Sequence, residues 1–176
     1  MTSLIAFTVL VLLVGVERIA ELVVSKRNLA WSTERGGVES GFGHYPFMVV
    51  LHTGLLVGAL VEAWVRRPDV PSLLAWSMLG VVVLSQALRW WCITTLGPQW
   101  NTRVVIVPGL APVRSGPYRF LSHPNYVAVV LEGAALPLVH AGWITALVFT
   151  VLNAGLLTVR IRCENAALAR LEPARA

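Results

Sequence analysis

Long apolar runs separated by short polar stretches make up most of the chain. The first three runs predict helices from about Ser3 to Val24, from Pro46 to Val65 and from Pro71 to about Leu96. Each is about 20 residues or longer, which is enough to cross a hydrocarbon core of about 30 Å. The segment Arg66-Arg67-Pro68-Asp69 is a short connection between the second and third helices.

Two shorter apolar runs follow, from Asn125 to Val139 and from Trp143 to Arg160. His140-Ala141-Gly142 offers a turn between them, and Pro137 disturbs the first run. We therefore expect a tight helical hairpin, with one continuous helix as the alternative. The predicted fold class is an all-α integral membrane protein, with about five transmembrane helices and a C-terminal helical hairpin.

Two longer polar segments separate these runs. The segment Gly97–Ser122 is rich in proline and glycine, which predicts a polar loop, with a short extended piece at Arg103–Val107. The segment Ser25–Tyr45 contains four glycines, which predicts a flexible loop that can also fold over a ligand.

Composition supports residence in a membrane. The chain of 176 residues is 56% hydrophobic and 13% charged, with a mean hydropathy of +0.71. Soluble domains carry about 25% charged residues, so lipid must cover the excess apolar surface here. The length suits a single domain over residues 1–176, with three N-terminal helices in 1–96 and the loop, hairpin and tail in 97–176.

The net charge of +5 does not indicate a nucleic-acid partner. The basic residues lie between apolar segments instead of forming a dense patch with interleaved aromatic residues, and this is typical of the positive-inside bias of membrane proteins. Cys92 and Cys163 are isolated and fit neither a disulfide framework nor a zinc motif, so we expect no metal site. Nothing in the sequence indicates an obligate protein partner.

Basic residues also predict the orientation. One side of the membrane would collect both long loops and the C-terminus, and the other would keep only Arg66 and Arg67. The basic residues on the first side are Lys26, Arg27, Arg35, Arg103, Arg114, Arg119, Arg162, Arg170 and Arg175. This excess predicts cytoplasmic loops, a cytoplasmic C-terminus and an N-terminus outside.

Polar residues concentrate at the predicted cytoplasmic ends of the helices, and in a membrane protein such a concentration indicates a functional site. Pro124 suits the first turn of a helix, with Ser122 or His123 as its cap. The free amides of that helix start attract a carboxylate or phosphate. Arg160 and Glu164 lie one turn apart and are expected to pair.

The hairpin adds a long-range expectation. It brings the beginning of one helix beside the end of the next, so His123 and Glu164 become neighbours although they are far apart in the sequence. The run G-P-Y-R-F-L-S-H-P-N-Y (116–126) and the run R-I-R-C-E-N-A-A-L (160–168) thus lie at one end of the hairpin.

These two runs resemble the isoprenylcysteine carboxyl methyltransferases and their relatives, the phospholipid methyltransferases. The resemblance implies an S-adenosylmethionine site formed by the hairpin and the preceding loop. The residues that match the family's cofactor contacts are Tyr118, His123, Pro124, Asn125, Tyr126 and Glu164. Three positions depart from the family pattern: Ser122 stands in place of arginine, Ala128 in place of glycine, and Asn165 in place of a second glutamate.

The likeness extends to small bacterial members through the stretches 43–52 and 96–109. It implies a bacterial plasma-membrane location and a lipidic substrate that enters from the bilayer. Some such relatives O-methylate long-chain alkylresorcinols and alkylpyrones, and a prenylated carboxylate is the alternative. The acceptor is then a carboxylate or a hydroxyl at the cytoplasmic face.

Three residues are candidates for catalysis. His44 lies beside the membrane surface and is a candidate base, although a plain surface histidine is an equal alternative. Arg103 or Arg162 would stabilise an anionic substrate oxygen. His52 is placed toward the interior of the second helix and is not favoured for catalysis.

Other functions remain as alternatives. A phospholipid N-methyltransferase would use the same cofactor, and a sterol-reductase-like enzyme would use NADPH. A non-enzymatic membrane assembly or transport protein is the third alternative, although transporters are expected to show inverted repeats that are not evident here.

Overall fold

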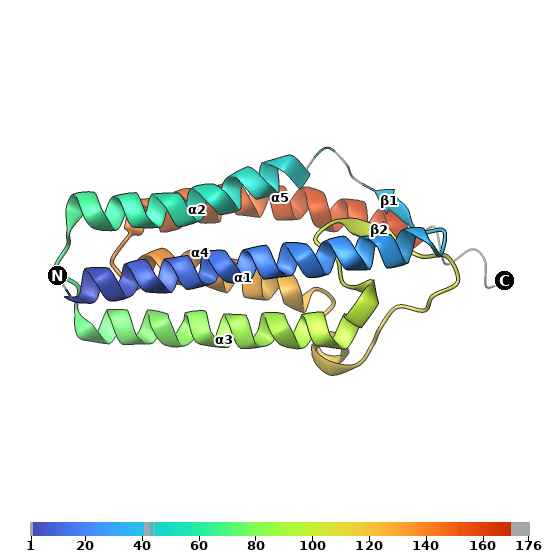
Figure 1. Ribbon diagram of the computed structural model, residues 1–176, viewed down its shortest axis with the longest axis horizontal. Coiled ribbons are helices and arrows are strands. Elements are labelled where there is room, and N and C mark those ends of the chain that lie inside the picture. Colours follow the sequence, from blue (N-terminus) through green and yellow to red (C-terminus); the bar gives the residue numbers. More distant parts are fainter. Residues whose placement is uncertain (1, 41–42, 44, 170–176) are drawn as a thin grey trace.

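The computed structural model describes residues 2–40, 43 and 45–169. Its five α-helices confirm the all-α class (Figure 1). They are α1 (Thr2–Thr33), α2 (Tyr45–Arg66), α3 (Ser72–Leu96), α4 (Pro124–Leu138) and α5 (Trp143–Ala169). Two short 3₁₀ helices, η1 (Gly97–Gln99) and η2 (Gly116–Arg119), and two short strands, β1 (Val38–Ser40) and β2 (Val104–Ile106), lie in the connections.

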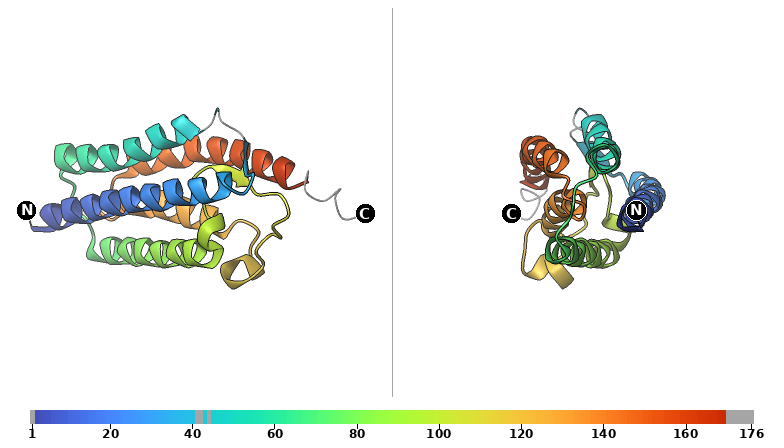
Figure 2. Two further views of the ribbon diagram at one scale, coloured as in Figure 1. Left: turned by 45° about the vertical axis from the view of Figure 1, so that its right-hand side comes forward. Right: turned by 90° about the vertical axis from the view of Figure 1, so that its left-hand side faces the viewer.

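The helices lie side by side along the long axis of the molecule and alternate in direction (Figure 1). α4 packs against both α3 and α5 and is largely enclosed by the rest of the bundle (Figure 2). The strands and 3₁₀ helices lie at one end of the bundle, called the loop end below. Only the two short connections after α2 and after α4 lie at the other end.

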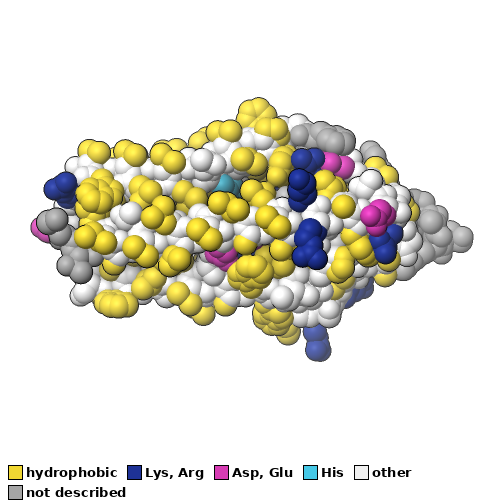
Figure 3. Space-filling view, in the orientation of Figure 1, with side chains coloured by type: hydrophobic (Ala, Val, Ile, Leu, Met, Phe, Trp, Pro, Cys, Tyr) yellow, Lys and Arg dark blue, Asp and Glu magenta, His cyan; other side chains and the backbone are white. Residues whose placement is uncertain are grey.

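Four of the helices, α1, α2, α3 and α5, are long and apolar enough to cross a membrane. The 15 residues of α4 rise only about 22 Å, so this helix is shorter than a hydrocarbon core. The long helices expose large apolar side chains, including Leu13 (62% exposed), Val50 (70%) and Leu84 (69%), as lipid-facing surfaces do. Most of the Lys and Arg side chains visible in Figure 3 lie toward the loop end.

The first helix is longer than its apolar run predicts. Residues 25–33 continue α1, so the prediction of a loop beginning at Ser25 was wrong for this stretch. The polar side chains here pack on the loop that follows α3: Asn28 donates to the carbonyl oxygens of Gly97 (3.1 Å) and Trp100 (2.7 Å). Because these polar groups find partners in the protein, the helix continues beyond its lipid-facing part. α5 similarly runs past Arg160 to Ala169.

The predicted extended piece at Arg103–Val107 contains β2, as expected. Its antiparallel partner β1 was not predicted, and the register places Glu39 opposite Val105. Arg103 donates to both carboxylate oxygens of Glu39, at 3.0 and 3.1 Å. The α1–α2 connection is thereby fastened to the loop between α3 and α4.

An ionic cluster ties α1 to α3 and α4 within the bundle. Arg89 donates to Glu21 (Nη2–Oε2 2.7 Å), and Arg18 donates to Glu21 (2.7 Å) and Glu132 (2.9 Å). Gln86 bonds Arg18 as well, so Gln86 and Glu132 face the bundle interior as expected for polar residues in apolar runs. Charged side chains buried among apolar helices require partners of opposite charge. Here the carboxylates of Glu21 and Glu132 each accept from an arginine.

The C-terminal hairpin is present. The turn after α4 contains Ala141 at φ +53°, and the Gly142 N–H donates to the Pro137 carbonyl (2.9 Å). Glu62 of α2 then accepts the N–H groups of Ile144 (3.1 Å) and Thr145 (2.8 Å) at the start of α5. This carboxylate satisfies amides that a helix start leaves free.

Close approach of α4 and α5 depends on Gly133, because a methyl group there would overlap the ring of Phe149. We predict that Gly133→Ala lowers the free energy of unfolding by about 1–3 kcal/mol, the usual cost of overpacking a filled interior. Gly80→Ala is the control, since no atom lies within 4 Å of a Cβ at that position. Melting temperatures in detergent measure both, and equal melting of the two variants would contradict the packing described.

Candidate functional site

A cavity of about 210 Å³ lies at the loop end of the bundle. Its walls come from the loop after α3, the start of α4 and the end of α5. The polar residues among its lining include Arg103, Tyr118, His123, Asn125, Tyr126, Arg160 and Glu164. This cavity, called the smaller cavity below, therefore carries many polar side chains at the loop end of the helices.

His123 and Glu164 are brought together at this cavity, as the hairpin predicts. Their Nδ1 and Oε2 atoms lie 3.8 Å apart. His123 is the N-cap residue of α4, but its side chain makes no capping hydrogen bond, and its ring stacks on Tyr126 with centroids 5.2 Å apart. The imidazole thus remains available to a ligand in the smaller cavity.

Tyr126 links Arg160 and Glu164, two of the charged residues of α5. The Arg160 Nε donates to the Tyr126 hydroxyl (2.8 Å), and that hydroxyl donates to the Glu164 carboxylate. The direct Arg160–Glu164 pair expected from their spacing does not form, because the phenol of α4 lies between them. The result is a hydrogen-bonded triad that joins the start of α4 to the end of α5.

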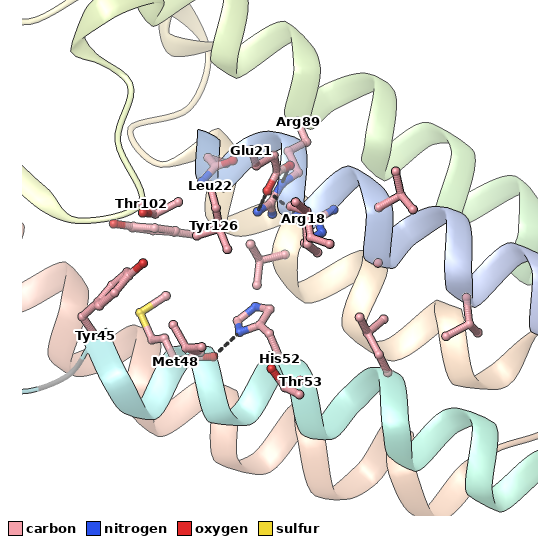
Figure 4. Close-up of a pocket in the computed structure, with 18 of the residues that line it drawn as sticks. Arg18, Glu21, Leu22, Tyr45, Met48, His52, Thr53, Arg89, Thr102 and Tyr126 are labelled. Atoms are coloured by element: carbon pink, nitrogen blue, oxygen red, sulfur yellow. Dashed lines mark hydrogen bonds and ion pairs between the residues drawn. The ribbon is translucent and has the colours of Figure 1, made fainter. Parts of the chain in front are cut away.

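A larger cavity of about 560 Å³ extends along the bundle between α1 and α2 (Figure 4). Its lining is mostly aliphatic, and wall residues on both helices, such as Val16 and Val57, are exposed. This larger cavity therefore opens sideways toward lipid. It adjoins the smaller cavity at five residues that line both: Trp100, Asn101, Asn125, Tyr126 and Arg160.

Most of the residues predicted for the site lie at the smaller cavity. Those that line it are Arg103, Tyr118, His123, Asn125, Tyr126 and Glu164. Pro124 is buried behind its wall and begins α4. Arg162 is exposed and lines neither cavity. His44 lies outside the described residues.

Arg103 lines the smaller cavity, but its guanidinium already contacts two other residues. Besides its two bonds to Glu39, its guanidinium lies 4.6 Å from the ring centroid of Tyr45. It thus fastens β1 and the start of α2 over the site, a role that spacing alone did not predict.

Tyr118 supplies a neutral donor. Burial raises the pKa of its phenol above the ordinary value, and the neighbouring Cys92 and Glu164 act in the same direction. The Tyr118 hydroxyl therefore keeps its proton at neutral pH and can donate a hydrogen bond to a ligand.

Two of the five residues that line both cavities carry a buried polar atom without a hydrogen-bond partner among the described residues. These atoms are the Asn125 Oδ1 and the Trp100 Nε1. Leaving such groups unpaired costs free energy, and both atoms belong to residues that line the two cavities.

His52 is the residue that sequence reasoning set aside and the structure places in a cavity. It lines the larger cavity together with Tyr45 and Met48 of the same helix (Figure 4). Their spacing of three and four residues marks one face of α2, which was the available signal. That signal was missed because aliphatic neighbours made the whole segment look like a plain membrane span.

Comparison with known proteins points to one family. The model of the isoprenylcysteine carboxyl methyltransferase (ICMT) family matches residues 78–170, which run from α3 to the end of α5. A protein of Bacillus subtilis, the uncharacterized protein YpbQ, is 36% identical over 163 residues, covering 92% of this chain and 96% of its own. An uncharacterized protein of Haemophilus influenzae is 26% identical over 159 residues, covering 89% and 91%. No solved structure matches.

The triad yields a prediction. Tyr126→Phe removes one hydroxyl that bonds two charged groups, so we expect a loss of about 1.5–3 kcal/mol in the free energy of unfolding. Tyr45→Phe is the matched control, because the Tyr45 hydroxyl has no hydrogen bond within the described residues. Thermal unfolding in detergent compares the two. A Tyr126→Phe protein as stable as the control would show that the hydroxyl does not hold the hairpin.

Proposed function

This chain belongs to the isoprenylcysteine carboxyl methyltransferase family, and we propose that it transfers a methyl group from S-adenosylmethionine to an oxygen of a membrane lipid at the cytoplasmic face. One observation carries the proposal: a polar cavity at the end of the helices meets an aliphatic cavity that opens toward lipid. A charged cofactor from the aqueous phase and an apolar acceptor from the bilayer would thus meet at the residues that line both cavities.

The residues of the smaller cavity suit the proposed cofactor. S-adenosylmethionine carries an ammonium, a carboxylate and a ribose, and these need acceptors and donors of matching kind. We assign Glu164 to the ammonium or ribose, and His123 to the carboxylate or to orienting the site.

Alignment is the main task of such a site. The cofactor supplies a methyl group on a sulfonium, and displacement from it requires the attacking oxygen to lie in line with the breaking bond. Arg160 lines both cavities and is held by Tyr126 and by the Met48 sulfur (3.2 Å). We assign its guanidinium to positioning an anionic acceptor oxygen at the junction, a role that the sequence reasoning gave to Arg103 or Arg162.

The membrane also favours the step itself. A carboxylate or an ionised hydroxyl that attacks a sulfonium cancels charge, so a poorly solvated junction helps the reaction. The aliphatic walls of the larger cavity exclude water from the acceptor side. The roles predicted for His44 and Arg162 remain predictions.

The cofactor assignment predicts selective thermal stabilisation. S-adenosylmethionine at about 100 times its Kd adds about 2.7 kcal/mol to the stability of the folded protein. For a chain of this size, that corresponds to a rise of about 5–10 °C in Tm in detergent. NADPH at the same concentration is the comparison ligand and should leave Tm unchanged. Stabilisation by NADPH alone would favour a reductase and end the cofactor assignment.

Substitutions of His123 and Glu164 test whether the cofactor binds in the smaller cavity. Glu164→Gln and His123→Gln each remove a charge-assisted contact worth about 1.5–3 kcal/mol, so the Kd for S-adenosylmethionine should rise about 10- to 150-fold. Glu34→Gln, on an exposed carboxylate that lines neither cavity, is the matched control and should bind as the wild type does.

The same variants test the reaction. Membranes are incubated with labelled S-adenosylmethionine and a lipid extract, and mass spectrometry identifies the methylated product and its acceptor atom. Wild type and Glu34→Gln should label a lipid oxygen, and the two site variants should not at limiting cofactor. Label on a headgroup nitrogen would instead identify a phospholipid N-methyltransferase.

A further inference from the structure

The larger cavity is aliphatic along most of its length but carries one histidine part of the way along. His52 of α2 projects toward the α1 wall in Figure 4. Its Nδ1 lies 2.8 Å from the carbonyl oxygen of Met48, one turn earlier in the helix. A carbonyl oxygen can only accept, so in the neutral ring the proton is on Nδ1 and Nε2 is left as an acceptor.

The ring is held in this orientation. Besides the bond to Met48, its plane meets the ring of the buried Phe149 edge-on, with centroids 5.3 Å apart. The Nε2 atom has no hydrogen-bond partner among the described residues, and it is not among their fully enclosed unpaired atoms. It therefore presents a fixed acceptor to whatever fills the cavity.

The opposite wall does not satisfy this acceptor. Arg18, Glu21 and Arg89 line the cavity across from His52 (Figure 4), where the Glu21 carboxylate accepts from both arginines. The unpaired Arg18 Nε and Arg89 Nη1 are enclosed by protein and do not reach the cavity surface. An alkyl tail would leave the Nε2 unpaired in a site without water. A ligand that donates a hydrogen bond there would gain about five- to 150-fold in affinity over one that does not.

The position of His52 relative to the junction is also defined. Met48 touches Arg160, which lines both cavities, through a contact of 3.2 Å. His52 follows Met48 by four residues, so it lies about 6 Å farther along α2. A group bound at His52 is therefore one helical turn deeper in the membrane than a group held at Arg160.

We propose that His52 accepts a hydrogen bond from a hydroxyl of the lipid substrate, so that the larger cavity selects lipids with a hydroxyl one helical turn deeper than the methylated oxygen. This inference rests on the proposed function. A carboxylate or ether at that depth has no proton to donate. An ammonium would lose its hydration in a largely aliphatic cavity, where Glu21, a carboxylate of its lining, already pairs with two arginines.

A matched pair of lipids tests the proposal: octadecanoic acid and 5-hydroxyoctadecanoic acid, which share a tail and a carboxylate and differ by one hydroxyl placed about one helical turn below that carboxylate. Binding of each is measured directly in nanodiscs, without cofactor, to wild type, His52→Phe and His52→Gln. Phenylalanine keeps the ring without the acceptor, and glutamine retains an acceptor oxygen. His140→Phe is the control, because this second buried histidine lines neither cavity.

Wild type and His140→Phe should bind the hydroxylated lipid at least about five-fold more tightly than the lipid without the hydroxyl. His52→Phe should abolish this preference, and His52→Gln should keep part of it. A preference unchanged in His52→Phe, an equal loss for both lipids, or no preference in wild type overturns the proposal. An equal loss would instead indicate a general structural or base role.

Cofactor binding and methyl transfer are measured in addition to lipid binding, so that the proposed function and the role of His52 are tested independently. His52 does not line the smaller cavity, so the Kd for S-adenosylmethionine should stay within about two-fold of wild type in both His52 variants, which also reports correct folding. If wild type binds no cofactor and labels neither lipid, the proposed function fails, whereas the lipid preference still decides the role of His52.

Discussion

The hydroxyl of Tyr126 is the contact on which the site depends. It accepts from Arg160 and donates to Glu164, and so joins the first turn of α4 to the last turns of α5. A hairpin of two apolar helices has little to fix its register in lipid, where apolar packing alone discriminates weakly. The bonded triad supplies that register. His123, three residues before Tyr126, then lies with its Nδ1 3.8 Å from the Glu164 carboxylate at the smaller cavity.

The membrane explains why the two cavities differ. Within the hydrocarbon span, charged groups persist only when paired, and the Arg18–Glu21–Arg89 cluster meets that condition by bonding internally. At the loop end, water is available, and His123 and Asn125 retain unused hydrogen-bonding capacity. In the proposed function, the cofactor would be recognised by polar contacts at the loop end and the acceptor by apolar contact deeper in the bundle, with Arg160 at the boundary.

Apolar periodicity and helix-breaking residues were sufficient to predict the helices and the hairpin. The apolar runs located all five helices, and Pro137 with Gly142 located the hairpin, from which the meeting of His123 and Glu164 followed. It did not predict the pairing of β1 with β2 or the extension of α1 beyond Ser25, because those depend on contacts between distant segments. The insertion of Tyr126 between Arg160 and Glu164 was missed for the same reason: helical spacing describes one helix and not its neighbour.

A structure of the protein in nanodiscs with S-adenosylhomocysteine bound is the most direct measurement. The account predicts density for the ligand within the smaller cavity, in contact with His123 and Glu164, and with its sulfur directed toward the wall shared by Trp100, Tyr126 and Arg160. Ligand density at any other place, or His123 and Glu164 found at opposite faces of the membrane, would contradict it.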